Sequence, residues 1–254
     1  MSTTLVLFRQ DLRLHDHPAL IAAASRGNVV PVFIHDEEQA GDWHLGGASQ
    51  WWLHESLKSL AASISALSGR LILRRGNTIS VLRSLQEESD ADAIYFSRQY
   101  QPWSGPLETL INNEFHDVNV SIKRFPGTLL HEPGSVLTGS GTAFKVFTPF
   151  WRAANKQVVA LPLTQPDVVW HTHPVASDDL AEWQLQPEAQ DGVPNWADGW
   201  QDLWQPGEEG AHHALADRHN WRPIPRACHT TSRNAAPHHR QPTASPYRNH
   251  GAGG

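Results

Sequence analysis

Short apolar runs alternate with longer segments of mixed polarity over the first half of the chain. A run of four to eight apolar residues rich in Val, Ile and Phe is typical of a buried strand. The first such run is Leu-Val-Leu-Phe, and the second is Val-Val-Pro-Val-Phe-Ile. The pattern predicts strands at 5–8, 29–34, 71–73, 93–96 and 118–125.

The intervening segments repeat apolar residues every three or four positions, as one face of a helix requires. Asn77 precedes one segment and is expected to cap it, because its side chain can accept from free backbone amides. A later helix is expected to begin at Pro149, with Thr148 as its cap. The predicted helices before it are 18–26, 46–67, 77–89 and 105–115. The buried face of 46–67 is expected to comprise Trp52, Leu53, Leu57, Leu60, Ile64 and Leu67.

Strands and helices therefore alternate four times before a final strand. This order predicts an α/β fold: a Rossmann-like, five-stranded parallel sheet with helices on both faces. Open sheets of this kind bind ligands at the carboxyl ends of their strands. A site is expected in the loops that follow Phe8, Ile34, Leu73 and Phe96.

The second half of the chain has a different composition. Beyond Val159, prolines and scattered polar residues with few aliphatics predict an irregular linker. From 217 to 254, His, Pro and Arg dominate, and Ile224 is the only aliphatic residue larger than alanine. Such a segment cannot build a core, so a disordered tail is expected.

Charge and composition narrow the class of protein. The 254 residues carry a net charge of −6, which excludes a wholly basic nucleic-acid binder. The single cysteine, Cys228, excludes an internal disulfide framework and a Cys-x-x-Cys metal site. No apolar run approaches the roughly 20 residues of a membrane span, and the N-terminus lacks a basic leader. We expect a cytoplasmic protein with no membrane partner.

Motifs that would indicate other chemistry are weak. There is no phosphate-binding Gly-x-x-x-x-Gly-Lys loop, which argues against a nucleotide-binding enzyme of the same architecture. Gly46 and Gly47 open a helix, where they either form a flexible entrance or present amides to an anion. No metal site is expected, because no third ligand stands at a convincing spacing from the paired histidines. These are His15, His17, His171, His173, His212 and His213.

The stretch LFRQDLRLHDHPAL resembles the N-terminal motif of the DNA photolyase and cryptochrome family. Further segments resemble the same family in the same order, over about 1–160. They are VVPVFIHDEE, GGASQWWLHESLKSL, LILRRGNTISVL, IYFSRQYQPW and GTLLHEPGSVLTGSGTAFKVFTPFWR.

The resemblance implies a light-driven function. Photolyases split ultraviolet-induced pyrimidine dimers in DNA, using reduced FAD held in a C-terminal helical domain. Their N-terminal α/β domain often holds an antenna chromophore: a deazaflavin, a flavin or methenyltetrahydrofolate. By this resemblance, 1–130 is the antenna domain and 131–216 is a linker that the FAD domain would cover.

The end of the chain departs from the family pattern. The segment PGEEGAHHAL resembles the start of the FAD domain, but no flavin motif in a helical pattern follows it. We expect an antenna domain and linker with no catalytic residue and no FAD site, inactive on damaged DNA by itself. The segment 217–254 is then either an out-of-frame tail or a natural disordered end. The alternative function is a stand-alone photosensor or interaction module of the cryptochrome type.

Antenna-chromophore residues are expected in the loops after the second and fourth strands. Tyr100 and Trp103 offer flat rings, and Arg98 offers a charge for a phosphate or a glutamate tail. His44 either contacts the pigment or is an ordinary surface histidine. The set is His35, Asp36, Glu37, His44, Gly46, Gly47, Arg98, Tyr100 and Gln101.

Two other groups are expected at an interdomain surface. Arg9, Asp11 and Arg13 alternate, so they share one side of an extended chain and can form a bidentate network with each other. They serve as interdomain or structural contacts, touch the chromophore, or are simply solvated. The second group is Lys145, Phe147 and Phe150, whose simplest role is to pack a linker helix on the sheet.

Overall fold

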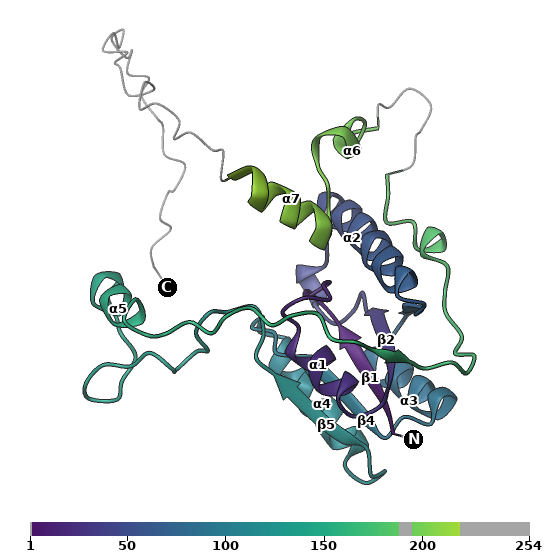
Figure 1. Cartoon of the computed structure of the whole chain (residues 1–254), viewed down its shortest axis with the longest axis horizontal. Helices are drawn as coiled ribbons and strands as arrows, with labels where there is room; N and C mark the ends of the chain where they lie inside the picture. Colours follow the sequence, from purple (N-terminus) through teal and green to yellow (C-terminus); the bar gives the residue numbers. More distant parts are fainter. Residues whose placement is uncertain (1, 188–194, 219–254) are drawn as a thin grey trace, which may run out of the picture.

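The sheet has the predicted parallel architecture (Figure 1). The structure is a computed structural model, and it describes residues 2–187 and 195–218. The sheet runs in the order β3-β2-β1-β4-β5, and each of these pairs is parallel. The strands are β1 (Thr3–Phe8), β2 (Asn28–His35), β3 (Ile72–Arg75), β4 (Ala93–Ser97) and β5 (Ser121–Phe125).

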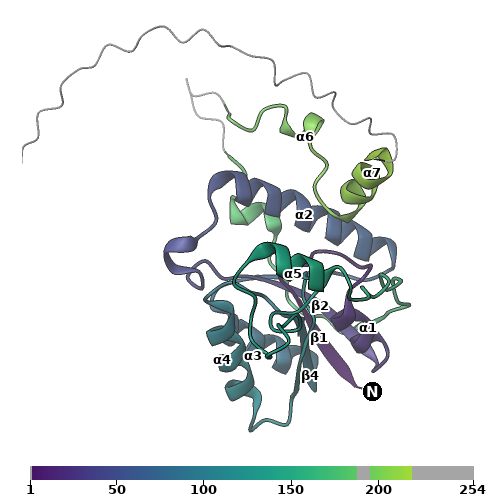
Figure 2. The same ribbon diagram turned by 90° about the vertical axis from the view of Figure 1, so that its left-hand side faces the viewer.

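Helices cover both faces of the sheet, as predicted (Figures 1 and 2). Along β1, Val6 and Phe8 pack on one side, and Leu5 and Leu7 pack on the other. The first core includes apolar residues of α1 and α2, and the second includes those of α3 and α4. The helices are α1 (Pro18–Ala24), α2 (Gly47–Ala66), α3 (Thr78–Ser89) and α4 (Ser104–Phe115). A short 3₁₀ turn, η1 (Gly41–Trp43), precedes α2.

The helix ends show which local predictions hold. Asn77 caps α3 as predicted, because its Oδ1 accepts from the amides of Ile79 and Ser80. The predicted face of α2 is wrong at two positions, because Trp52 is 44% exposed and Leu67, just after the helix, is 41% exposed, whereas Trp51 is 3% exposed. Trp52 lies beside the sheet-facing row and contacts Trp204 instead of the core.

The chain after 160 returns to the sheet, which the sequence did not predict. A two-residue strand, β6 (Val169–Trp170), pairs with Asn28 and Val29 of β2. The Nε1 of Trp170 donates to the carbonyl of Leu67 at 2.9 Å. Trp183, in the 3₁₀ turn η2 (Leu180–Trp183), is also buried in the core. This part of the linker therefore belongs to the packed domain.

The helix α5 (Phe147–Ala154) lies away from the sheet (Figure 1). It begins at Phe147 and not at Pro149, so the predicted cap at Thr148 is wrong. Phe147 is 71% exposed and Phe150 and Trp151 are also exposed, which contradicts the interpretation that this segment packs on the sheet. Phe147 and Trp151 instead stack on each other with their ring centroids 6.2 Å apart. Lys145, just before the helix, is exposed as well.

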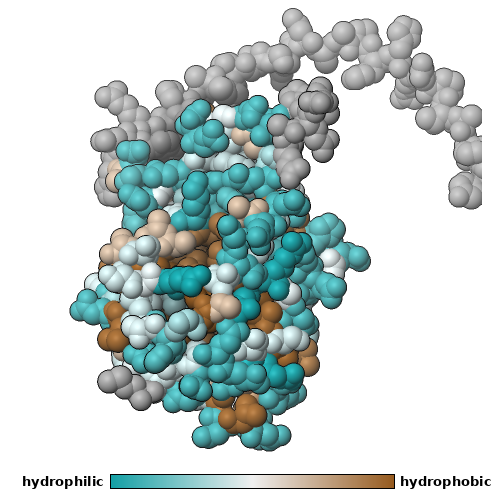
Figure 3. All heavy atoms as spheres, turned by 90° about the vertical axis from the view of Figure 1, so that its right-hand side faces the viewer, coloured by the Kyte–Doolittle hydropathy of each residue, from teal (hydrophilic) through white to brown (hydrophobic). Residues whose placement is uncertain are grey.

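The last described elements lie next to α2 (Figure 2). They are the short helix α6 (Trp200–Leu203) and α7 (Glu208–Arg218), and α7 contacts α2. The expected disordered tail lies outside the described residues except at its start, where α7 continues to Arg218. None of the helices in 2–187 and 195–218 has the length and apolar character that a membrane crossing needs. The side of the molecule in Figure 3 is mainly hydrophilic, with hydrophobic atoms gathered in smaller areas between polar ones.

Candidate functional site

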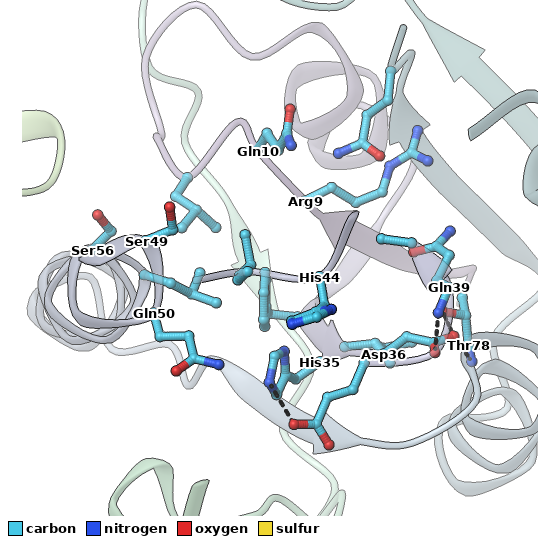
Figure 4. Close-up of a pocket in the computed structure, with 18 of the residues that line it drawn as sticks. Arg9, Gln10, His35, Asp36, Gln39, His44, Ser49, Gln50, Ser56 and Thr78 are labelled. Carbon is cyan, nitrogen blue, oxygen red and sulfur yellow. Dashed lines mark hydrogen bonds and ion pairs between the residues drawn. The ribbon is translucent and has the colours of Figure 1, made fainter. Parts of the chain in front are cut away.

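A cavity of about 760 Å³ opens at the carboxyl ends of the strands (Figure 4). Its walls come from the loops after β1, β2 and β4 together with α2 and the start of α7. Because β2 and β4 lie on opposite sides of β1, the loops that follow these strands diverge and leave a crevice. The cavity therefore lies where the strand order predicts a ligand site.

Arg9 is the charged group most deeply placed at this cavity. Its side chain is 9% exposed, and its Nη2 donates to Glu108 at 2.9 Å and to the carbonyl of Ser97. The guanidinium also lies over the ring of Phe96, 4.9 Å from the centroid. Within the part of the chain that the structure describes, its Nε and Nη1 are buried without a hydrogen-bond partner. Such donors are costly to leave unpaired, so they suit a ligand acceptor.

Glu108 fixes the position of Arg9. This carboxylate is 4% exposed, and its second oxygen accepts from Arg124 at 2.9 Å. Burial lowers the pKa of the Arg9 guanidinium, and the hydrogen bond and charge of Glu108 oppose that shift. The sequence prediction missed Glu108. The available signal was an acid between Leu107 and Ile111, on the otherwise apolar face of α4.

Two histidines line the same cavity, with Arg9 and Gln10 above them in Figure 4. The ring of His35 stacks on Trp183 at 5.4 Å with 26° between the planes, and its Nε2 lies 3.7 Å from Glu37. Burial lowers the pKa of His35, although Glu37 opposes the shift. His35 therefore presents a neutral, flat imidazole at neutral pH, and His44 lies beside it on the more exposed side.

Asp36 acts on the shape of the cavity wall. Its Oδ2 accepts from both the amide and the hydroxyl of Thr78 at 2.8 Å, and its Oδ1 accepts from the amide of Gln39. These bonds tie the loop after β2 to the start of α3. Asp36 thus lies at the cavity, but both of its carboxylate oxygens already accept hydrogen bonds from the protein.

The predicted glycines lie away from the cavity lining. A Cβ on Gly47 would meet the ring of Trp196 at 3.1 Å, so this helix start faces the later tryptophan segment. Three indole rings line the cavity, those of Trp43, Trp52 and Trp103, whereas the predicted ring of Tyr100 does not. Trp103 was predicted as a ring of the site, whereas Trp43 was not.

Arg98, Tyr100 and Gln101 line a separate pocket of about 60 Å³. Arg98 pairs with Glu132 at 3.1 Å, and the Tyr100 hydroxyl donates to the same carboxylate at 2.6 Å. The predicted charge for a phosphate or glutamate tail is thus already paired. Gln101 donates to Gln10. The neighbouring Gln99 lines both this pocket and the larger cavity.

The predicted network of Arg9, Asp11 and Arg13 with each other is wrong. Asp11 lies 3.0 Å from His17 Nε2 and accepts from the Arg9 amide, whereas Arg13 donates to the carbonyls of His15 and Asp16. The chain turns after β1, so the three side chains do not share one side.

The buried pair of Asp11 and His17 has a defined proton arrangement. His17 Nδ1 accepts from the amide of Leu20, so the proton lies on Nε2, which faces Asp11. Burial alone would raise the pKa of Asp11, but hydrogen bonds from His17, Ser97 and the Arg9 amide outweigh it. The pKa of Asp11 therefore lies well below its usual range.

The comparison with known proteins identifies the family. A family model described as DNA photolyase matches residues 4–167. The chain belongs to the DNA photolyase family. A deoxyribodipyrimidine photo-lyase of Agrobacterium fabrum is 40% identical over 221 residues, which are 84% of this chain and 44% of that protein. Cryptochrome-2 of Arabidopsis thaliana is 32% identical over 186 residues, 73% of this chain and 30% of that protein.

Solved photolyase structures share the fold. The crystal structure of a bacterial class III photolyase from Agrobacterium tumefaciens is 38% identical, with a TM-score of 0.78. The match covers 85% of this chain and 44% of that one. The chain thus spans less than half the length of each of these three photolyase-family relatives. Most of the residues that line the cavity lie within 4–167, the region that the family model matches, whereas Gly207, Glu208 and Ala211 lie beyond it.

Proposed function

We propose that the 760 Å³ cavity binds a planar antenna chromophore and that this domain collects light for a photolyase. The observation that carries the proposal is the buried Arg9, whose Nε and Nη1 have no partner among the described residues and which lines the cavity. A ring carbonyl or ring nitrogen of the pigment would accept from these donors. The neutral ring of His35 and the indole of Trp103 supply flat apolar surface nearby.

The three pigment classes share the chemistry that this site recognises. A flavin, a deazaflavin and methenyltetrahydrofolate each combine a fused aromatic ring with carbonyl acceptors. The cavity volume lies in the usual range for sites that bury most of a ligand of this size. When bound, such a pigment absorbs light and passes its excitation energy on.

DNA repair enters the proposal through family membership. We propose that splitting of pyrimidine dimers belongs to the whole photolyase, with FAD as its redox cofactor and damaged DNA as its substrate. The residues of this chain would act before that chemistry: they bind the antenna pigment, orient it and exclude water from it. We propose a cytoplasmic location for the protein.

The test is pigment binding by the purified full chain. Absorption and mass spectrometry of an extract would identify a retained pigment, and titration with riboflavin and methenyltetrahydrofolate would measure binding in a stripped sample. R9M should weaken binding at least tenfold, because it removes the two free donors. R98M is the matched control, since Arg98 lies in the separate small pocket.

Two outcomes would contradict the proposal. One is a chain that retains no pigment and binds neither probe. The other is pigment binding that R9M and R98M weaken equally. If R9M does not fold, W103A repeats the test. Trp103 also lies in the cavity wall, and its substitution changes no buried charge.

A further inference from the structure

Three potential metal ligands meet where the loop after β1 touches α7. His15 Nδ1 lies 3.0 Å from Glu208 Oε1, and His212 Nε2 lies 3.8 Å from the same oxygen. All three ligand atoms lie within 4.8 Å of one another. The two imidazole rings approach edge to face, with their centroids 5.5 Å apart.

The central carboxylate is already oriented by the backbone. Glu208 Oε2 accepts from the amide of Leu14 at 2.8 Å, and Oε1 accepts from the amide of His15 at 3.0 Å. Hydrogen bonds of this kind fix a ligand and are a regular feature of protein metal sites. The side chain of Glu208 is mostly buried, whereas the two histidines reach solvent. An ion could therefore enter from the open side.

We propose that His15, Glu208 and His212 bind a divalent transition-metal ion, with zinc as the best match. Two imidazoles and one carboxylate are an established ligand set for zinc and for its neighbours in the first transition row. Three protein ligands leave further positions on the ion for water or an exogenous group.

The existing distances are close to those of a metal site. With metal–ligand bonds of about 2.0–2.1 Å, adjacent ligand atoms lie about 2.8–3.4 Å apart in octahedral or tetrahedral geometry. The pair formed by His15 and Glu208 already has such a separation. His212 would have to approach Glu208 by a few tenths of an ångström and also move toward His15, since the three ligand atoms now lie within 4.8 Å of one another. It lies one helical turn after Glu208 and is exposed, so a small change of its side chain suffices.

The ion would join two segments that are distant in the sequence. His15 and Glu208 are separated by 193 positions. Glu208 also lines the 760 Å³ cavity, together with Gly207 and Ala211. A bound ion would therefore hold the start of α7 against the loop after β1 and fix that wall of the cavity.

The test is titration of the metal-free full chain with Co²⁺ and Zn²⁺. Co²⁺ should give a visible ligand-field absorption band that Zn²⁺ abolishes, and Zn²⁺ should raise the melting temperature. H212A and H15A should each weaken the tightest class of sites at least tenfold and remove the thermal shift. Glu208 is left intact, because it also holds the amides of Leu14 and His15.

H213A is the matched control. His213 is the neighbour of His212 on α7, but its ring contacts Gln205 and not the cluster. H213A should keep the Co²⁺ band and the thermal shift. Histidines elsewhere, such as His171 and His173, contribute the same background in every variant. Equal Zn²⁺ affinity and equal thermal shifts in H212A and H213A would overturn the proposal, as would the lack of any ion-dependent band.

Discussion

The buried pair of Arg9 and Glu108 allows a stability prediction with a clear magnitude. E108Q keeps the shape of the side chain and removes its charge. Arg9 would then be buried with only the Ser97 carbonyl and an amide oxygen as acceptors. Removing one partner of a buried ion pair costs about 3–5 kcal/mol, because the remaining charge is no longer compensated. Because Gln can still accept a hydrogen bond from one arginine, we expect a loss at the low end of this range, about 3 kcal/mol in the free energy of unfolding.

The matched control is E114Q. Glu114 pairs with Arg83 on the outer surface, where both side chains are partly exposed. Such exposed pairs contribute little to stability, because solvent screens them. Equilibrium urea unfolding, followed by circular dichroism and extrapolated to water, measures both losses. If E108Q is within 1 kcal/mol of E114Q, Arg9 has found another partner or solvent, and the argument for its free donors at the cavity fails.

Three further predictions concern the linker, the buried Asp11 and a helix cap. W170A should lower the free energy of unfolding by about 3–5 kcal/mol, because it leaves a cavity in the core. W204A should lower it by less than about 1 kcal/mol, because Trp204 is mainly exposed. Urea unfolding compares the two variants. The pKa of Asp11 is lower in the folded state than in the unfolded state. Its ionised carboxylate therefore contributes fully to the free energy of unfolding above pH about 4, and this contribution declines as the pH falls further. The stability of wild type relative to D11N should therefore decrease below pH 4, and an unchanged difference between pH 7 and 3 would contradict this account. N77A should cost about 1 kcal/mol by removing the cap of α3, and restoration by N77D would attribute the loss to capping.

The sheet could be predicted because its signals are local. β1, β2 and β4 are short, mainly apolar runs, whereas β3 and β5 also contain charged residues. Asn77 marks the start of α3 within three residues of the amides that it caps. The same kind of reasoning placed the cavity, since the strand order determines where the crevice opens. These features depend on neighbours in the sequence and on general rules of parallel sheets.

The side-chain partners could not be predicted, because they come from distant segments. Arg9 pairs with Glu108 across 99 positions, and Glu208 reaches His15 across 193. No spacing in the sequence brings such residues together, which is why a metal cluster was not expected. Trp170 and Trp183 lie in the segment that the sequence predicts as an irregular linker, where prolines and scattered polar residues accompany few aliphatics. Their burial becomes visible only when the chain returns to the sheet.

The pairing of β6 with β2 has a consequence for synthesis of the chain on the ribosome. Trp170 bonds to Leu67 across 103 positions, so this contact is among the later ones to become possible. At about 5–20 residues per second, Trp170 is made roughly 5–20 s after Leu67. Until then, Asn28 and Val29 lack their β6 partners, and the core beside α2 lacks its indole. The nascent chain is therefore most open to chaperones and to edge-to-edge aggregation in those seconds.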